Sequence, residues 1–384
     1  MKAVTGLHYH GCHPQSPTPA TKISIPVSPG GGTEAALLGK GRYKAWALAA
    51  IALLALWSMF AASVTLRWSS GDLATAFQDV SDPLFDDLDP LDGTGHSRTV
   101  QGAVDMVPAG NTRRVKILVK PGVYREKVTV PITKPFVSLI GMGTGRTVIT
   151  WNARASDIDP SGHQVGTFLS ASVAVEADYF CASHITFENS APAAPPGAVG
   201  QQAVALRLSG DKTMLYRCRI LGTQDTLFDN IGRHYLFNCD IQGSIDFIFG
   251  NARSLYQGCR LHAVATSYGA IAASQRSSPS EESGFSFVGC RLTGSGMLYL
   301  GRAWGKYARV VYSYCDLSGI VVPQGWSDWG DHTRTKTVLF GEYNCKGPGA
   351  SSRQRVPWSR ALTYDEARPF LGRDFINGEQ WLRL

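Results

Sequence analysis

Residues 216–261 read YRCRILGTQDTLFDNIGRHYLFNCDIQGSIDFIFGNARSLYQGCRL, and this stretch contains the pattern that decides the fold. In it an aromatic residue is followed two or three positions later by cysteine, and then by Ile or Leu two positions further on. The pattern recurs along the chain at steps of 21, 20, 31 and 25 residues, around Cys218, Cys239, Cys259, Cys290 and Cys315. Alternating apolar residues broken by Gly and Asn are typical of short strands joined by turns, and a repeat near 20 residues is typical of a solenoid.

The predicted fold is therefore all-β, a right-handed parallel β-helix in which each coil stacks on the previous one at a spacing of ~4.8 Å. No sustained amphipathic helical pattern competes with this interpretation. The open end of a solenoid needs a cap, and residues Thr99 to Pro108 can form a short amphipathic capping helix. The region from about Arg355 to the C-terminus, rich in Trp and Phe, is expected to cover the other end or to pack along the side.

The repeated cysteines allow two interpretations. They are small apolar residues suited to stacking inside the solenoid, and in an oxidising compartment they are also able to form disulfides. Inward stacking needs no bridge, so buried thiols are the preferred expectation.

The 384-residue chain carries a net charge of +7, and its excess of base lies in residues 97–384. A basic region favours an acidic partner such as nucleic acid, anionic lipid or an acidic polysaccharide, although an ordinary solvated surface has the same composition. Apart from the adjacent pair Arg113-Arg114, the bases are scattered singly and form no run typical of a nucleic-acid-binding arm, so nucleic acid is not expected as a partner.

The N-terminal part is predicted to hold a membrane segment. Residues 45–66 contain no charged side chain and are about as long as the ~20 residues that cross a bilayer. Because 44 residues precede this stretch, an uncleaved signal-anchor is favoured over a cleaved signal peptide. Lys40, Arg42 and Lys44 lie just before it, which predicts a cytoplasmic N-terminus and a body in the lumen or outside the cell. The predicted organisation is a disordered cytoplasmic tail (1–44), a transmembrane anchor (45–66), an acidic linker (67–96) and a catalytic β-helix (97–384).

Two aspartates occupy equivalent places in successive repeats. Asp225 lies seven residues after Cys218, and Asp246 lies seven residues after Cys239. Stacked coils would bring the two carboxylates within a few ångströms, where the two charges repel and one pKa rises. Such a pair supplies one charged nucleophile or base and one protonated acid. A ladder of Asp residues at a turn, with a purely structural role, has the same spacing.

The neighbours of this pair favour chemistry. Gln224 precedes Asp225, and an amide can stabilise a developing oxyanion without titrating. Arg302 can orient a carboxylate through a bidentate contact. Trp304 and Trp326 offer flat surfaces suited to sugar rings, although packing is the commoner role of a lone Trp. No Gly-x-Ser-x-Gly motif occurs, so a serine nucleophile is not indicated.

Five motifs resemble those of the plant pectin methylesterases (pectinesterases), and they occur in that family's order. They are Gly122-Val-Tyr-Arg-Glu126, Gln202-Ala-Val-Ala-Leu-Arg207, Gly222-Thr-Gln-Asp-Thr-Leu-Phe228, Gly243-Ser-Ile-Asp-Phe-Ile-Phe-Gly250 and Leu300-Gly-Arg-Ala-Trp304. The resemblance implies a right-handed parallel β-helix that removes methyl esters from homogalacturonan in the cell wall and needs no metal or organic cofactor. It also implies a monomer, with a proteinaceous pectinesterase inhibitor as a further partner. Residues 1–96 are too short and too polar for the inhibitor-like pro-region of many plant members.

The resemblance also implies a role for each matching residue. Asp246 would attack the ester carbonyl, and Asp225 would protonate the departing methanol and later activate water. Gln202 and Gln224 would stabilise the oxyanion, and Arg302 would hold Asp246 and the uronate. The substrate-binding surface would comprise Trp304, Phe228 and Phe247.

Two other functions remain open from the sequence. Another pectin-active β-helix enzyme would be a lyase, with a calcium-binding Asp cluster, or a glycosidase, with carboxylates set apart for a water or a glycosyl intermediate. A wall-binding module with an inactive site is the non-enzymatic alternative. Methanol release without chain cleavage would distinguish the esterase from all of these.

Overall fold

The computed structural model describes residues 96–194 and 198–382. All of them belong to the second of two compact units, Ser70–Leu384. The predicted tail, the membrane anchor at 45–66 and nearly all of the acidic linker lie outside the described residues. Within the described ranges, no helix is both long enough and apolar enough to cross a membrane.

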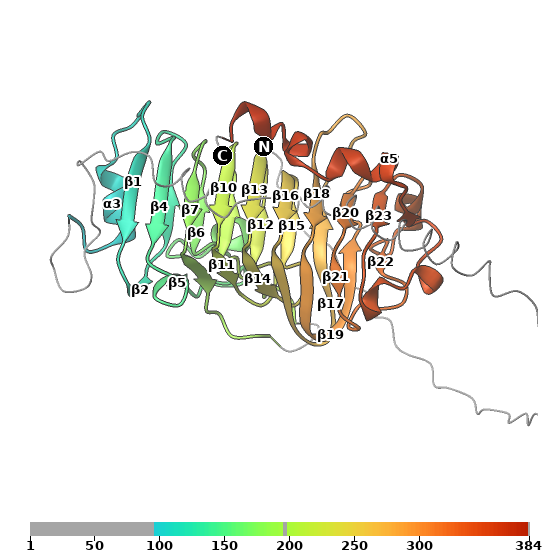
Figure 1. The fold of residues 1–384 in the computed structure, drawn as a ribbon. Coiled ribbons are helices and arrows are strands. Elements are labelled where there is room, and N and C mark those ends of the chain that lie inside the picture. The colour runs from blue at the N-terminus through green and yellow to red at the C-terminus, as the bar shows by residue number, and fades with distance from the viewer. Residues whose placement is uncertain (1–95, 195–197, 383–384) are drawn as a thin grey trace, which may run out of the picture. The chain divides into compact units, whose positions relative to one another are not determined.

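The strands follow one another in parallel coils, which confirms the predicted parallel β-helix (Figure 1). The first face is one continuous parallel sheet in the order β1 (Val115–Val119), β4 (Val137–Gly141), β7 (Cys181–Ser183), β10 (Thr213–Tyr216), β13 (Arg233–Phe237), β16 (Arg253–Gln257), β18 (Gly284–Val288), β20 (Arg309–Ser313), β23 (Leu339–Tyr343) and β24 (Arg360–Ala361). The second face contains β2 (Gly122–Arg125), β5 (Thr147–Trp151), β8 (Thr186–Asn189), β11 (Arg219–Leu221), β14 (Asp240–Gly243) and β21 (Asp316–Leu317).

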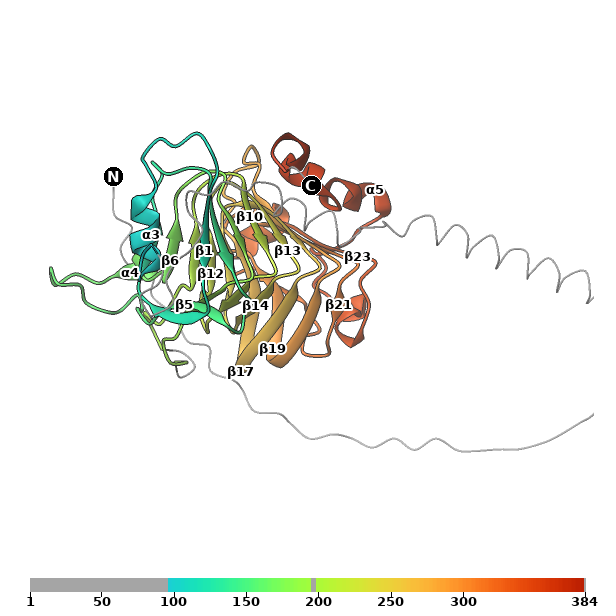
Figure 2. The same ribbon diagram turned by 60° about the vertical axis from the view of Figure 1, so that its left-hand side comes forward.

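The third face carries the site described below. It contains β3 (Val128–Val130), β6 (Val173–Val175), β9 (Leu206–Leu208), β12 (Leu227–Asp229), β15 (Ile248–Gly250) and β22 (Trp326–Ser327). Two long strands, β17 (Arg260–Ser274) and β19 (Arg291–Arg302), pair with strands of both the second and the third face and so join the two. Figure 2 shows the coils from nearer the end of the stack.

The interior is filled by in-register rows of apolar side chains. On the first face, Leu215 pairs with Leu236, and Tyr256 is in register with Phe287 and then Tyr312. The rings of Tyr256 and Phe287 stack at 4.6 Å and those of Phe287 and Tyr312 at 4.5 Å. Each such side chain stabilises the fold by roughly 1.5–3 kcal/mol when fully buried.

The repeated cysteines lie inside this core, as preferred from the sequence. Cys218, Cys239, Cys259, Cys290 and Cys315 are at most 1% exposed. The Cys239 thiol donates to the backbone oxygen of Leu215 at 3.6 Å, one coil earlier, and Cys259 donates likewise to Leu236 at 3.4 Å. All seven cysteines in the described part of the chain are unpaired thiols.

A short helix, α3 (Val100–Met106), contacts β1 and β3 at the beginning of the stack, where the sequence predicts a cap (Figure 2). The Thr99 side chain accepts a hydrogen bond from the backbone N–H of Gly102 and begins the helix. The Glu126 carboxylate accepts from the N–H of Val100 at 2.8 Å, which ties the helix to the first coil. The capping helix is thus confirmed.

The C-terminal region both extends the stack and packs along its side. Strand β24 pairs with β23, and the 3-10 helix η5 (Arg373–Ile376) contacts β13 and β16 on the outside of the first face. The Ser286 hydroxyl donates to the backbone oxygen of Phe370 at 2.6 Å. The remaining helices are α4 (Gly166–Leu169), α5 (Tyr364–Ala367), η1 (His332–Lys336), η2 (Pro348–Ala350), η3 (Ser352–Gln354), η4 (Arg368–Phe370), η5 (Arg373–Ile376) and η6 (Gly378–Gln380).

Candidate active site

Asp225 and Asp246 occupy equivalent positions on consecutive coils, just before β12 and β15. The N–H of Asp225 donates to the backbone oxygen of Ile245 at 3.0 Å, and Gln224 forms a bridge with Ile245. Both aspartates have left-handed backbones, with φ of 58° and 46°. Asp adopts this conformation more readily than most residues, and non-glycine residues held there are enriched at functional sites.

Asp246 is only 5% exposed and is held by an arginine from far along the chain. Arg302, at the end of β19, donates from Nε to Oδ1 of Asp246 at 2.9 Å and from Nη2 to Oδ2. This two-point contact is charge-assisted on both sides and fixes the plane of the carboxylate.

Asp225 is half-buried and has a different environment. Burial first, and the charge of Asp246 second, raise its pKa well above the usual range, although the charge of Arg302 and a hydrogen bond with Gln224 act in the opposite direction. Two neighbouring carboxyl groups therefore have different surroundings, and Asp225 is suited to carrying a proton.

The two glutamines lie beside the pair on neighbouring coils. The N–H of Ala203 donates to the backbone oxygen of Gln224 at 3.1 Å, which places Gln202 on the coil before Gln224. Both glutamines are half-buried, and the Gln224 side chain is hydrogen-bonded with Asp225.

An apolar surface lies next to the carboxylates, outside the β-helix interior. The ring of Phe228 stacks on that of Phe249 at 4.4 Å, and Trp304 lies 6.1 Å from Phe249. Phe168 of α4, 45% exposed, meets Phe228 edge-on at 6.1 Å. Phe228, Phe249 and Trp304 belong to a small cluster, separate from the main core, that also includes Ala171, Ala174, Val204, Ala273 and the half-buried Trp329.

One aromatic prediction was wrong, and for Trp326 the structure shows the packing role that the sequence left open. Phe247 is fully buried in the main core, so it is unable to line a substrate surface. Phe249, 4% exposed, belongs instead to the aromatic cluster of Phe228 and Trp304. Trp326 is 1% exposed and stacks on Phe340 at 4.6 Å, so it packs the interior.

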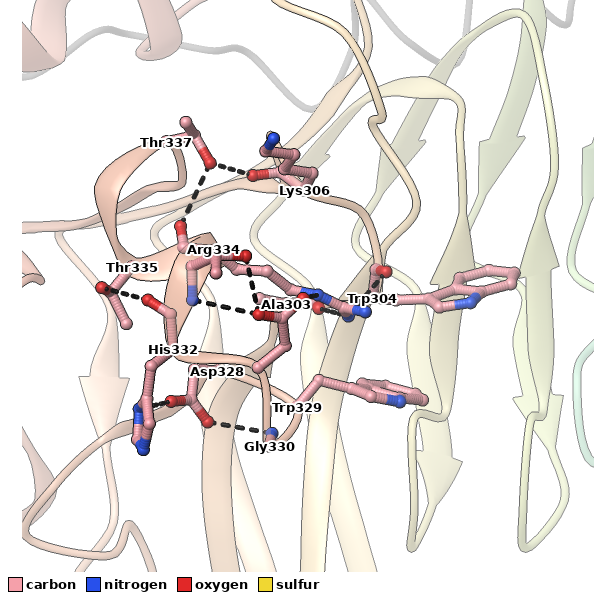
Figure 3. A network of polar contacts seen from close by, with 12 residues as sticks. Ala303, Trp304, Lys306, Asp328, Trp329, Gly330, His332, Arg334, Thr335 and Thr337 are labelled. Carbon is pink, nitrogen blue, oxygen red and sulfur yellow. Dashed lines mark hydrogen bonds and ion pairs between the residues drawn. The ribbon is translucent and has the colours of Figure 1, made fainter. Parts of the chain in front are cut away.

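Trp329 is a site residue that the sequence reasoning missed. Its ring lies 3.8 Å from Cζ of Arg302, the arginine that holds Asp246. Figure 3 shows the side chains of Trp304 and Trp329 extending in the same direction from neighbouring loops. Its signal in the sequence is a Trp between Asp328 and Gly330, where a turn rather than a core strand is expected.

The geometry combines an arginine-held carboxylate, a neighbouring carboxyl group whose pKa is raised, two amide side chains and an aromatic cluster. A charged carboxylate can act as a nucleophile, a protonated neighbour can release a leaving group, and amides can stabilise an oxyanion. The fold and the site thus define a class of protein, the parallel β-helix proteins that carry a pair of neighbouring carboxyl groups in a polar and aromatic site.

Comparison with known proteins agrees with this class. The sequence model of the pectinesterase family matches residues 90–379, and a second model, described as a protein of unknown function (DUF1195), matches residues 11–120. "Pectinesterase QRT1" from Arabidopsis thaliana is 58% identical over 294 residues, which cover 76% of this chain and 77% of that protein. "Putative pectinesterase 11" from the same plant is 43% identical over 293 residues, covering 76% and 79%.

Solved structures give the same result. A pectin methylesterase from carrot superposes with a TM-score of 0.70 at 34% identity, covering 78% of this chain and 96% of that one. The enzyme from Aspergillus niger gives a TM-score of 0.64 at 28% identity, covering 76% and 93%. The chain belongs to the pectinesterase family.

Proposed function

We propose that the site removes methyl esters from homogalacturonan through a covalent intermediate on Asp246. The observation that carries the proposal is the unequal environment of the stacked pair: Arg302 holds Asp246 with two hydrogen bonds, and burial beside Asp246 raises the pKa of Asp225. This asymmetry divides the roles of nucleophile and acid between two groups that are otherwise alike.

In the first half-reaction, a carboxylate oxygen of Asp246 forms a bond with the C6 ester carbon. The carbonyl oxygen becomes an oxyanion, which the amides of Gln202 and Gln224 stabilise. When the carbonyl re-forms, the bond to the methoxy oxygen breaks and Asp225 supplies the proton that makes methanol. An anhydride between Asp246 and the uronate remains.

In the second half-reaction, Asp225 is ionised and accepts a proton from a water molecule. The resulting hydroxide attacks the anhydride carbon, and the bond to Asp246 breaks. The products are a galacturonate carboxyl group and the original carboxylate of Asp246, with the proton back on Asp225. Trp304, Phe228 and Phe249 would supply apolar faces to the sugar rings, as aromatic side chains do at sugar sites.

Methanol release with intact chains is the test. The purified protein is incubated with highly esterified pectin, and methanol, uronate chain length and unsaturated ends are measured together. We expect methanol with no change in chain length. Shorter chains would indicate a glycosidase and unsaturated ends a lyase. Absence of methanol, shorter chains and unsaturated ends together would indicate a wall-binding module.

The N-terminal expectations belong to the same proposal. Residues 45–66 would insert as a signal-anchor and place the β-helix in the lumen of the secretory pathway, from which it reaches the cell wall either anchored or released by proteolysis. Protease digestion of microsomes is the test, since a lumenal body is protected until detergent is added. The β-helix would act as a monomer on an acidic polysaccharide, with a proteinaceous inhibitor as a second partner, and size-exclusion chromatography would measure the oligomeric state.

A further inference from the structure

Arg334, in η1, joins the two loops that carry the tryptophans of the site. Its Nη1 donates to the backbone oxygen of Ala303 at 2.5 Å and to that of Trp304 at 2.9 Å (Figure 3). Its Nε donates to Oδ2 of Asp331 at 3.1 Å, within its own loop. One guanidinium thus ties the segment after Arg302 to the loop after β22.

The segment of residues 303–305 follows directly after the end of β19 at Arg302. The N–H of Ala303 donates to the backbone oxygen of Ser327 at 2.9 Å, and the N–H of Gly305 donates to the backbone oxygen of Ser274 at 2.8 Å. The carbonyl oxygens of Ala303 and Trp304 accept from Arg334. Hydrogen bonds from a charged donor are stronger than those between neutral groups, so the two bonds from Arg334 add to the backbone bonds that orient this peptide and with it Trp304.

The second loop holds Trp329 in an unusual conformation. Trp329 has φ of 63°, which a bulky residue rarely adopts without support from its surroundings. That support includes Asp328, which accepts from the N–H of Gly330 at 2.9 Å, and Asp331, which begins η1 by accepting from the N–H of Thr333. Because Asp331 also binds Arg334, the loop of Trp329 and the peptide of Trp304 are held by one connected network.

The geometry points to Arg334 as a positioning residue that sets the relative placement of Trp304 and Trp329. It acts through their backbones and through the Trp329 ring on Arg302, without touching the reacting atoms. The inference rests on the proposed function, because it treats the two tryptophans as walls of the sugar-binding surface. Its consequence is that Arg334 governs substrate binding more than the chemical step.

Three variants of the full chain test the inference: Arg334→Met, Arg334→Lys, and Lys336→Met as a control. Lys336 is an exposed cation in the same 3-10 helix, so its removal changes the charge of the loop by the same amount. Melting temperature, kcat and KM are measured on methyl-esterified oligogalacturonides. Loss of binding shared by the ground and transition states raises KM and leaves kcat unchanged, and we expect Arg334→Met to raise KM about tenfold. Lys336→Met should match the parent.

Arg334→Lys decides the matter if Arg334→Met does not fold. An ammonium is a point charge that lacks the rigid fork of a guanidinium, so Lys should restore the fold and only part of the affinity. Unchanged KM in either folded variant would overturn the inference. A fall in kcat and melting temperature together at constant KM would also overturn it, because it indicates a purely structural role.

Binding without turnover separates this inference from the proposed function. The affinity of Asp246→Asn for an esterified hexagalacturonide is compared with that of Asp246→Asn/Arg334→Met by calorimetry. We expect the double variant to bind about tenfold more weakly, the same factor as in KM. Equal affinities would refute the role of Arg334, whereas methanol release by Asp246→Asn would refute the proposed function and leave the binding result valid.

Discussion

Arg302 contacts both carboxylate oxygens of Asp246 although 56 residues separate them in the chain. The contact arises from the stacking of coils: Arg302 is in register with Ala273, Ala273 with Phe249, and Phe249 with Phe228. One outward row of the third face therefore carries both the aromatic surface and the arginine that holds Asp246. This row, more than any single loop, assembles the site.

Replacing Asp246 by Asn tests the nucleophile directly. Asn has the same shape but is a poor nucleophile, so we expect methanol release to fall by several orders of magnitude, of the order of 10⁴-fold, with the protein still folded. Circular dichroism and the melting temperature establish folding, and a methanol assay measures turnover. Near-parental turnover in the folded variant would mean that the aspartates form only a structural turn ladder.

Asp225 should make stability depend on pH. The pKa of Asp225 is raised in the folded protein. At pH values between the unfolded and the folded pKa, the folded state therefore keeps a proton that the unfolded state has lost. The stabilisation is fully present below the unfolded value of about 3.9 and is lost as the pH rises through the folded value. Asn does not titrate, so Asp225→Asn does not lose this stabilisation. The melting temperature of the variant minus that of the parent should therefore increase from about pH 4 to about pH 8. Melting curves across this range are the measurement, and parallel profiles would contradict the raised pKa.

The fold and the register of the two aspartates were predictable because they depend on spacing alone. A step of 21 residues separates Cys218 from Cys239 and also Asp225 from Asp246, so stacking one pair stacks the other. Asp225 and Asp246 both have left-handed backbones, so the turn has the same conformation in each of the two coils. From spacing alone Arg302 was expected only to orient a carboxylate, because two longer coils hide its register with Asp246. The resemblance to the family named Asp246 as its partner, and the structure shows that contact.

Side-chain direction near the turns was not predictable. Simple alternation places Phe247 and Phe249 on the same face, but β15 begins only at Ile248, after the left-handed residue Asp246. Phe247 therefore belongs to the turn and enters the core. The directions of the Trp326 and Trp329 side chains were equally hard to predict. Trp326 lies in β22 and its ring points into the core, whereas Trp329 lies in the site loop just after β22 ends at Ser327.

Phe247 and Phe249 form a matched pair for testing this correction. Phe247→Ala should leave a cavity in the core and lower the free energy of unfolding by about 3–5 kcal/mol. Phe249→Leu keeps most of the apolar volume but removes the ring that stacks on Phe228 and contacts Trp304, so it should raise KM for esterified oligogalacturonides with a smaller loss of stability. Denaturant unfolding and steady-state kinetics are measured on both. The reverse pattern, with Phe247→Ala stable and weak in binding, would restore the original assignment.

A buried pair, His234 and Asp229, lies away from the carboxyl groups of the candidate active site. His234 and Asp229 are fully buried, with Nδ1 of His234 2.5 Å from Oδ1 of Asp229. The other ring nitrogen donates to the backbone oxygen of Gly210 at 2.8 Å, and Tyr256 donates to Oδ2 of Asp229 at 2.5 Å. Burial disfavours the charged imidazole, but the charge of Asp229 and these hydrogen bonds outweigh it and, with a smaller contribution from Asp211, raise the pKa of His234.

Removing one partner of a buried charge pair costs about 3–5 kcal/mol, so His234→Phe should be strongly destabilised at pH 6. The pKa is raised on folding, so the contribution is full below the ordinary value of about 6.5 and declines as the pH rises through the folded value. The stability difference between parent and His234→Phe should therefore shrink from pH 6 to pH 9. Tyr256→Phe is the control, since it keeps the pair and loses one hydrogen bond to a charged group, a cost of roughly 1.5–3 kcal/mol. Urea unfolding at each pH measures all three proteins, and a difference that grows with pH would show that His234 is neutral when folded.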